Sequence, residues 1–487
     1  MRKQNLRMKM QYKYWIGAAL IGIASCTPAK KLVIPETTAV PEKFVAESDV
    51  DTNSIAQISW KNFFQDEKLI RLVDSALAKN WDFLSAYQRI EAARAQYRRA
   101  RGAMAPTVNL QASASGDRYG KYTMTGVGNF DTNLSPNITD NQKVNTDFTP
   151  EMFLGARSIW EVDLFGKLKN QKVAAHLQMM AAEKSVQLFQ TALVAEISTL
   201  YYDLISLDKE LEVILKNIEL QTAATEIVEV QKIGGRATEL AVQQFKAQLL
   251  NTKALEKDVR TEINAIENQL NVLIGRFPQK IDRAQNFDNI TFTENLATGL
   301  PASMILNRPD IQEAELALAS KKASVKSARA ALLPGLTISP QVGFTSFNAS
   351  VLFNPSSLAF GVLGGLTQPF LNRSALIADI EQNNASAMEA FYQYQKTIQN
   401  SFAEVNTQIN KIGFLKDKVQ LKFEESSLMN AAITTSKELY LAGYANYLEV
   451  ITSQKSALET ELDLIKTRRD LLNSSIILYR SLGGGWN

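Results

Sequence analysis

The sequence lacks the residues on which most metal and catalytic sites depend. Its 487 residues include one histidine, His176, and one cysteine, Cys26. A single histidine excludes a multi-histidine metal site and leaves a histidine-based catalytic triad only one possible base. No Gly-x-x-x-x-Gly-Lys-Ser/Thr loop for nucleotide phosphates occurs either. The sequence therefore predicts that the protein is not an enzyme and that it has no cofactor and no metal site.

Long hydrophobic runs are missing after the first 25 residues. No apolar stretch of about 18 residues follows Cys26, so no transmembrane helix is expected in the mature chain. Residues 1–25 combine five basic residues with the apolar run Trp15–Ala24, which is typical of a secretory signal. Ile23-Ala-Ser-Cys26 resembles a bacterial lipobox, in which the cysteine becomes the lipidated first residue. The alternative is that Cys26 is only a small residue at the end of the signal.

A strong charge of one sign is also missing. The formal net charge is +3, and it becomes −2 when the five basic residues of the signal are removed. A nearly neutral mature chain gives no electrostatic argument for binding nucleic acid.

The sequence contains two copies of one large unit. The segment Ile233–Val242 returns as Leu441–Val450, with Gly235 matched by Gly443. Upstream, Ala100–Pro106 is mirrored by Ala328–Pro334. A repeat this long predicts one architecture around a pseudo-symmetry axis rather than a short-period solenoid. The expected organisation is a signal peptide (1–25), a lipid-anchored arm (26–60), a first repeat (61–275), a linker (276–302), a second repeat (303–483) and a tail (484–487).

Each copy contains two segments that alternate between apolar and polar residues. In the first, Val108 and Leu110 alternate with Asn109 and Gln111. Strands are expected at about 107–116, 152–164, 335–346 and 358–368, and spans of about 10 residues suit tilted membrane strands. Because lipid tolerates no open sheet edge, four strands must be completed by other subunits or lie outside a bilayer. An ordinary amphipathic sheet packed on helices is the alternative.

The rest of the chain is expected to be helical. Residues 167–233 contain neither proline nor glycine, and residues 373–442 contain only Gly413, which predicts two helices about 100 Å long. Shorter helices at 67–104, 236–274, 308–332 and 444–482 would stack end to end beside them. The glycines Gly234, Gly235 and Gly443 would form the hairpin tips, where a helix ends in a residue with positive φ.

Several ordered motifs resemble one known family. They are the lipobox, the duplicated unit, the Ala-Arg-x-Ala-x-x-Pro entry to each strand pair, Trp160–Gly166, Asn307–Asp310 and Tyr440–Leu448. Together they resemble the TolC-like outer-membrane efflux channel family, and in particular its NodT-like lipoprotein branch that serves RND-type multidrug efflux pumps. The resemblance covers residues 55 to 483.

The resemblance implies a mainly α fold with a small membrane β part. Three copies would form a homotrimer, with an α-barrel in the periplasm and a 12-stranded outer-membrane β-barrel to which each subunit gives four strands. The protein would be a passive exit duct, anchored to outer-membrane lipid, with a periplasmic adaptor and an inner-membrane RND-type transporter as partners. The adaptor would dock at the hairpin tips. The alternatives are the outer-membrane component of a type I protein secretion system, a periplasmic adaptor, or a structural coiled-coil envelope lipoprotein.

The resemblance also points to a pore aperture near the second tip. Family members tend to have acidic residues six and nine positions after the tip glycine. Here these positions are Glu449 and Thr452, so only the first matches in charge. Three Glu449 carboxylates around a threefold axis would attract counter-ions. A Glu449 on an outer helix face is the alternative.

Overall fold

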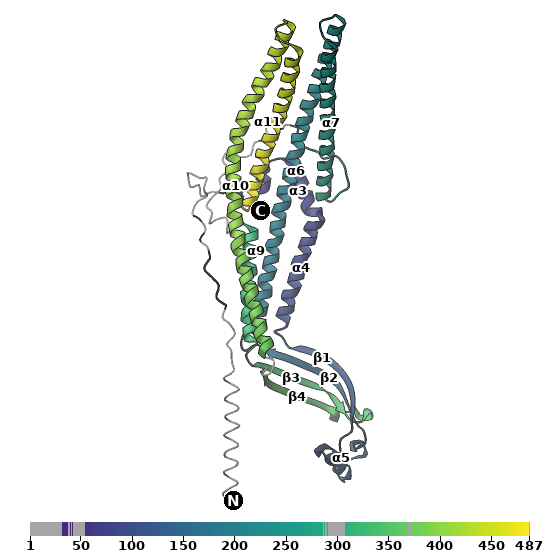
Figure 1. Cartoon of the computed structure of the whole chain (residues 1–487). Helices are drawn as coiled ribbons and strands as arrows, with labels where there is room; N and C mark the ends of the chain where they lie inside the picture. The colour runs from purple at the N-terminus through teal and green to yellow at the C-terminus, as the bar shows by residue number, and fades with distance from the viewer. Residues whose placement is uncertain are drawn as a thin grey trace. The chain divides into compact units, whose positions relative to one another are not determined.

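The computed structural model describes residues 32–37, 39, 41, 54–285, 287, 290, 307–368 and 373–486. The expected signal and Cys26 lie outside these described residues, as does most of the expected arm and linker. The described chain is mostly helical with one four-stranded sheet, which confirms the predicted fold class (Figure 1). Over the described ranges, no helix has an apolar stretch long enough to cross a membrane.

The chain divides into two compact units. One contains Tyr97–Ala175 and Ala319–Phe391 and includes the sheet. The other contains Thr37–Gln96, His176–Leu318 and Tyr392–Asn487 and includes the helical hairpins. The long helices α6 (Lys167–Ile233) and α10 (Arg373–Leu441) have residues in both units.

The sheet is an antiparallel meander. Its strands are β1 (Thr107–Asp117), β2 (Thr149–Val162), β3 (Gly335–Ser346) and β4 (Leu358–Thr367), in the order β1-β2-β3-β4. The central pair β2–β3 joins the two sequence copies, while β1 and β4 form the two edges.

The register places most of the apolar residues of the four strands on one face. Leu110 pairs with Ala156, Ala156 with Val342, and Val342 with Phe360. Directly paired residues point to the same side of a sheet, so this row is apolar from one edge to the other. The opposite face has the row Asn109, Arg157, Gln341 and Gly361.

The connection between β1 and β2 is not simply a loop. It contains the helix α5 (Met124–Leu134), whose N-cap is Thr123. The Gly126 N–H donates to Thr123 Oγ1 at 3.1 Å. This cap compensates for the two glycines inside α5, which weaken helix propensity.

The helix expected at 67–104 is in fact two helices, α3 (Glu67–Lys79) and α4 (Trp81–Gly102), so that prediction is wrong. Asn80 between them has an extended backbone and is 4% exposed. Its Oδ1 accepts from the Phe83 N–H at 2.7 Å and caps α4, while its Nδ2 donates to the Leu273 carbonyl at 2.9 Å. The break is stable because one side chain satisfies two helix ends.

Two helical hairpins make up most of the second unit. Helix α6 returns as α7 (Glu239–Leu273), and α10 returns as α11 (Tyr447–Ser481) (Figure 1). Between them in sequence lies α9 (Pro309–Ala330). The bounds of these returning helices lie a few residues inside the expected ones, because Thr238 and Asn446 begin them as N-caps.

The core of this unit contains a group of packed aromatic residues and includes the end of the expected arm. Helix α2 (Trp60–Phe64) inserts Phe63, whose ring stacks on Tyr479 at 4.2 Å. The Tyr479 hydroxyl donates to the Ile58 carbonyl at 2.6 Å, and burial raises the pKa of Tyr479. Tyr201 is also fully buried, and its hydroxyl donates to Asp66 at 2.8 Å. Ile55, Ala56 and Trp60, at the end of the expected arm, therefore belong to the same packed core as Phe63 and Phe64.

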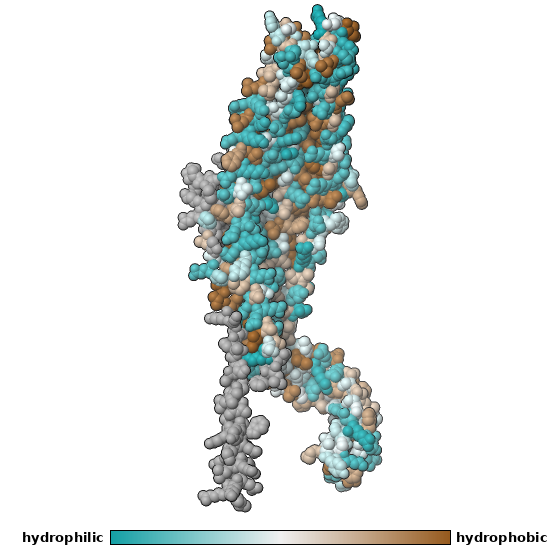
Figure 2. All heavy atoms as spheres, viewed as in Figure 1, coloured by the Kyte–Doolittle hydropathy of each residue, from teal (hydrophilic) through white to brown (hydrophobic). Residues whose placement is uncertain are grey.

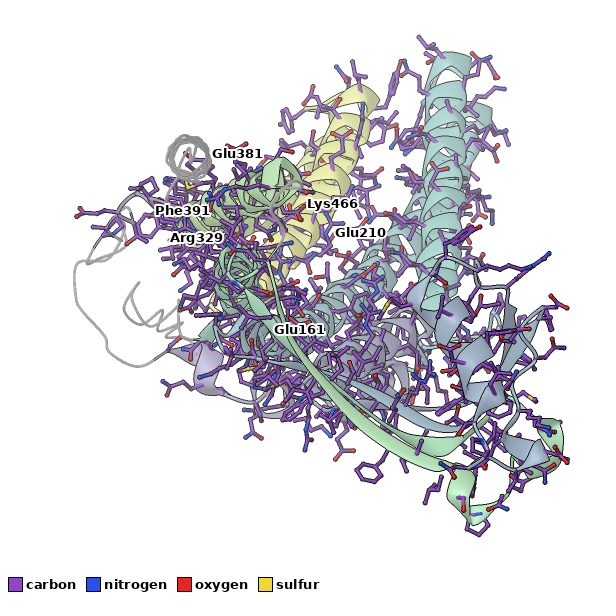
Figure 3. The ribbon with its side chains drawn as sticks, turned by 90° about the horizontal axis from the view of Figure 1, so that it is seen from below. Glu161, Glu210, Arg329, Glu381, Phe391 and Lys466 are labelled. Atoms are coloured by element: carbon purple, nitrogen blue, oxygen red, sulfur yellow. The ribbon has the colours of Figure 1, made fainter. Side chains whose placement is uncertain are left out.

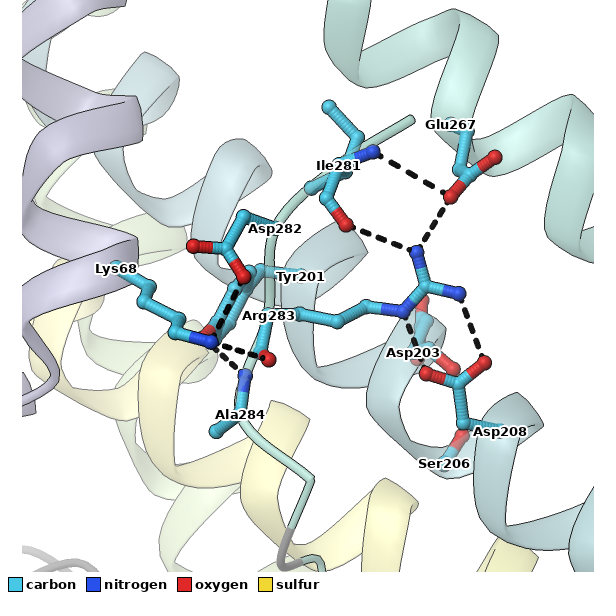
Figure 4. Close-up of polar contacts among 10 residues, drawn as sticks. All are labelled: Lys68, Tyr201, Asp203, Ser206, Asp208, Glu267, Ile281, Asp282, Arg283 and Ala284. Carbon is cyan, nitrogen blue, oxygen red and sulfur yellow. Dashed lines mark hydrogen bonds and ion pairs between the residues drawn. The ribbon is translucent and has the colours of Figure 1, made fainter. Parts of the chain in front are cut away.

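Arg283 joins the described start of the linker to the first hairpin (Figure 4). Its guanidinium donates twice to Asp208 of α6, at 2.5 and 2.8 Å, and once to Glu267 of α7 at 2.5 Å. Next to it, Lys68 of α3 pairs with Asp282 at 2.7 Å. The linker thus ties α3, α6 and α7 together.

Arg308 makes the corresponding connection at the start of the second copy. It pairs with Asp310 at 2.8 Å and with Glu404 of α10 at 3.1 Å, and it donates to the carbonyl of Ser481 at the end of α11. Its side chain is only 10% exposed. Burial opposes its charge, but the two carboxylates outweigh this and raise the pKa of Arg308. Glu404 also pairs with Arg480.

Candidate functional site at the helical hairpin tips

The first tip joins α6 to α7 through Gly234 and Gly235. Gly235 has a φ of +66°, whereas Gly234 is not among the residues with positive φ. The Arg236 N–H donates back to the Gln231 carbonyl at 2.8 Å, which closes the end of α6. The next helix starts at Thr238, whose Oγ1 accepts from the Ala241 N–H at 3.1 Å.

The second tip has the same construction with a stronger cap. Gly443 has a φ of +77°, and the Tyr444 N–H donates to the Leu439 carbonyl at 2.9 Å. A Cβ added to Gly443 would meet no atom within 4 Å. The requirement for glycine here is therefore the backbone conformation and not a lack of space.

Glu449 is exposed and belongs to a capping box at the start of α11. Asn446 Oδ1 accepts from the Leu448 and Glu449 N–H groups at 2.9 and 3.3 Å, and the Glu449 carboxylate accepts from the Asn446 N–H at 3.4 Å. Thr452 is exposed nearly one turn further along α11. The Asn-x-x-Glu spacing that signals this cap is visible in the sequence, although the prediction assigned Glu449 only to the pore aperture.

The two tips are joined to one another. The Tyr440 hydroxyl of α10 donates to Gln231 Oε1 of α6 at 2.6 Å, and burial raises the pKa of Tyr440. Val228 and Phe245 of the first hairpin form a buried cluster against which Tyr447 and Ile451 of α11 pack. One hydrogen bond and one small apolar cluster therefore couple the hairpins near their ends.

Both tips expose large apolar side chains. Ile233 is 88% exposed and Tyr444 is 86% exposed. Their exposed apolar neighbours are Val230, Leu240, Leu441 and Leu448. Figure 2 shows hydrophobic residues among hydrophilic ones at the ends of the hairpins. Exposed apolar groups gathered in this way are typical of a protein-binding surface.

A second exposed apolar feature runs along α10. Phe414, Leu421 and Leu428 follow one another at intervals of seven residues, and each is well over half exposed. On α6, Leu220 and Ile227 have the same spacing and are 54% and 48% exposed. Heptad spacing is that of a coiled-coil seam, so each of these faces is shaped to pack against another helix.

One carboxylate is buried between the hairpins. Glu210 of α6 is 3% exposed and lies near Lys466 and Arg469 of α11 (Figure 3). Burial raises the pKa of Glu210, while the two cations oppose this shift. Its Oε1 makes no hydrogen bond to a described residue. Across the described ranges, no group of three or more histidine, cysteine, aspartate or glutamate residues is arranged to hold a metal ion.

Comparison with known proteins agrees with this geometry. The model of the family described as "Outer membrane efflux protein" matches residues 72–276 and 300–484. The cation efflux system protein CusC of Escherichia coli is 26% identical over 477 residues, which cover 97% of this chain and 98% of CusC. Outer membrane protein OprJ of Pseudomonas aeruginosa is 28% identical over 97% of this chain and 96% of OprJ.

Solved structures give the same result. The outer-membrane channel OprN has a TM-score of 0.83 and 26% identity, over 95% of this chain and 100% of OprN. A structure of CusC has a TM-score of 0.80 and 25% identity over 94% of this chain. The family model alone matches well over half of the sequence, and the predicted resemblance is confirmed. The chain belongs to the outer membrane efflux protein family.

Proposed function

We propose that three copies of this chain form a passive exit duct in the outer membrane. The duct carries substrates that an inner-membrane RND-type transporter and a periplasmic adaptor deliver to it. The observation that supports this most strongly is the open four-stranded sheet, which has one apolar face and two unpaired edges within the described chain.

The sheet is suited to closure between copies. Because β1 and β4 run in opposite directions, β4 of one copy can pair with β1 of the next and continue the antiparallel order. Leu110, Phe360 and Val362 are 89, 86 and 73% exposed on the apolar face, which would face lipid. In a bilayer the edge N–H and C=O groups must be paired, so closure stabilises the assembly strongly. Three copies give twelve strands.

The helices support the same assembly. The exposed heptad faces of α6 and α10 belong to opposite hairpins of the chain, so one copy can present its α10 seam to the α6 seam of its neighbour. Contacts of this type would close a ring of helices around an aqueous interior. CusC is named as a protein of a cation efflux system and not as an enzyme, and a passive duct needs no catalytic group.

We assign the tips to adaptor docking and to the aperture. The exposed apolar residues around Gly234, Gly235 and Gly443 would receive the apolar face of an adaptor hairpin. Glu449 and Thr452, on the first turns of α11, would line the aperture. The double substitution Ile233→Ser and Tyr444→Ser is expected to weaken binding of a purified adaptor without changing channel conductance. Equal adaptor binding would place docking elsewhere.

We also propose that residues 1–25 are a signal peptide and that Cys26 becomes the lipidated first residue of the mature chain. The lipid on Cys26 would anchor the chain to the outer membrane in addition to the membrane strands. Labelled fatty acid should be incorporated by the wild type and not by Cys26→Ser. Equal labelling of both proteins would contradict the assignment.

The proposed function is tested by reconstitution. Purified complex inserted into a planar bilayer should conduct ions without any nucleotide, and deletion of the gene should sensitise cells to substrates of the partner pump. Phe360→Arg serves as a matched control, since it puts a charge on the proposed lipid face and should abolish insertion. A wild-type complex that neither inserts nor conducts would overturn the proposal.

A further inference from the structure

The polar face of the sheet contains one isolated cation. Arg157 is exposed in the middle of β2, and the register places it in a row with Asn109 of β1 and Gln341 of β3. Both neighbours are uncharged amides. The two neighbouring rows on this face contribute hydroxyl, amide, glycine and apolar positions from the other strands, and none of these positions is charged. The guanidinium therefore lies on a surface without acidic groups close to it.

Arg157 is held by an aromatic ring. Its Cζ lies 4.4 Å from the centre of the Phe153 ring, on the same face of the same strand. Phe153 in turn lies over two glycines that pair across β2 and β3, Gly155 and Gly343. A Cβ built on Gly155 would lie 2.9 Å from the ring and 2.3 Å from the Val342 carbonyl oxygen.

The glycines therefore make room for the ring, and the ring supports the guanidinium. This gives Arg157 a defined position in place of the wide freedom of an exposed side chain. A fixed cation has a lower entropic cost of binding than a mobile one.

The charge of Arg157 is not neutralised locally. It makes no ion pair and no hydrogen bond with a residue that the structure describes, so its N–H edge remains available. Elsewhere on this face of the four strands, acidic groups occur only toward the ends, at Asp117, Glu151 and Glu161. Glu161 is four residues away, about 13 Å along the strand, and already pairs with Lys167 at 2.8 Å.

We propose that Arg157 forms an anion-attracting ring inside the strand region of the duct. This inference rests on the proposed function, because three copies place three guanidinium groups around one aqueous lumen. A guanidinium presents several N–H donors in one plane, a geometry that suits carboxylate, sulfate and phosphate oxygens. The ring favours small inorganic anions and carboxylate-bearing cargo over cations at this level.

The test is ion selectivity in planar bilayers. The reversal potential across a KCl gradient gives the permeability ratio of chloride to potassium for wild type and for Arg157→Gln. Removing three charges from one level should lower that ratio on the order of two- to fivefold at 0.1 M salt, because a Debye length is then comparable to a pore radius. Arg157→Lys is the matched control, since it keeps the charge and should keep the ratio close to that of wild type.

A second variant protects the test against failure of assembly. Gln341→Arg adds a second cation to the same row and should raise the chloride preference and strengthen block by added citrate. The inference is overturned if Arg157→Gln conducts with wild-type selectivity, or if Gln341→Arg leaves both selectivity and citrate block unchanged. Absence of any conductance in the wild type would instead contradict the proposed function itself.

Discussion

Arg308 offers the clearest test of how the duplicated chain is held together. Replacing it with methionine keeps most of the side-chain volume and removes the charge. The substitution leaves Asp310, Glu404 and the Ser481 carbonyl without their shared donor. Because the Arg308 side chain is only 10% exposed, the loss corresponds to breaking a buried ion pair, which costs about 3–5 kcal/mol.

Arg480 provides a matched control, because it binds the same carboxylate from a more exposed position. Its side chain is 38% exposed, and Arg308 still holds Glu404 when Arg480 is replaced. Arg480→Met should therefore cost about 1 kcal/mol or less. The difference in stability between the two variants therefore measures the effect of burial on an ion pair with the same partner, Glu404.

Thermal unfolding of the purified complex in detergent, followed by circular dichroism, measures the difference. Unfolding entropy of about 2 cal/mol/K per residue means that 1 kcal/mol shifts the midpoint by roughly 1 °C for a chain of this size. Arg308→Met should lower the apparent midpoint by about 3–5 °C, and Arg480→Met by about 1 °C or less. Equal shifts would refute the argument that the buried connection determines stability.

Three further predictions concern the sheet, the tip and the buried carboxylate. Phe360→Arg should reduce the stability of the inserted sheet by about 2–4 kcal/mol near the bilayer midplane and lower the yield of trimer on gels, whereas Thr337→Arg on the opposite face should be tolerated. Equal trimer yields for the two variants would contradict a lipid-facing apolar side. Glu449→Gln keeps an acceptor for the Asn446 N–H while Glu449→Ala does not, so only the alanine variant should lose about 0.5–1 kcal/mol of stability at the N-terminus of α11. Both variants should reduce channel block by divalent cations, and unchanged block would mean that Glu449 does not line the aperture. Burial raises the pKa of Glu210, so ionisation of Glu210 destabilises the fold as pH rises through that pKa. Glu210→Gln should therefore raise the melting midpoint more at about pH 8 than at about pH 5. The same difference in midpoint between variant and wild type at both pH values would contradict this.

The large elements were predictable because their signals are local. The long helices follow from stretches with almost no glycine or proline, and the strand pairs follow from strict alternation. The break at Asn80 was not predictable from such signals. No glycine or proline marks it, and the second role of Asn80 depends on the Leu273 carbonyl, almost 200 residues away.

Less of the candidate site could be predicted from the sequence, because its contacts also join residues that are far apart in the chain. The tip glycines could be located from the repeat, but the link between Tyr440 and Gln231 requires two separate hairpins to lie together. The support of Arg157 by Phe153 depends on Gly155 pairing with Gly343, and no periodicity reveals that register. Glu449 is the exception, because its capping spacing is local. The lipidation of Cys26 stays a prediction.

The number of copies in the membrane complex tests the central claim most directly. The mass of the complex, released intact from outer membranes in mild detergent and measured by native mass spectrometry, should equal three lipidated mature chains. It should also fall to single chains when Phe360→Arg prevents closure of the sheet. A wild-type complex that contains one chain, or a number other than three, would contradict the proposed duct.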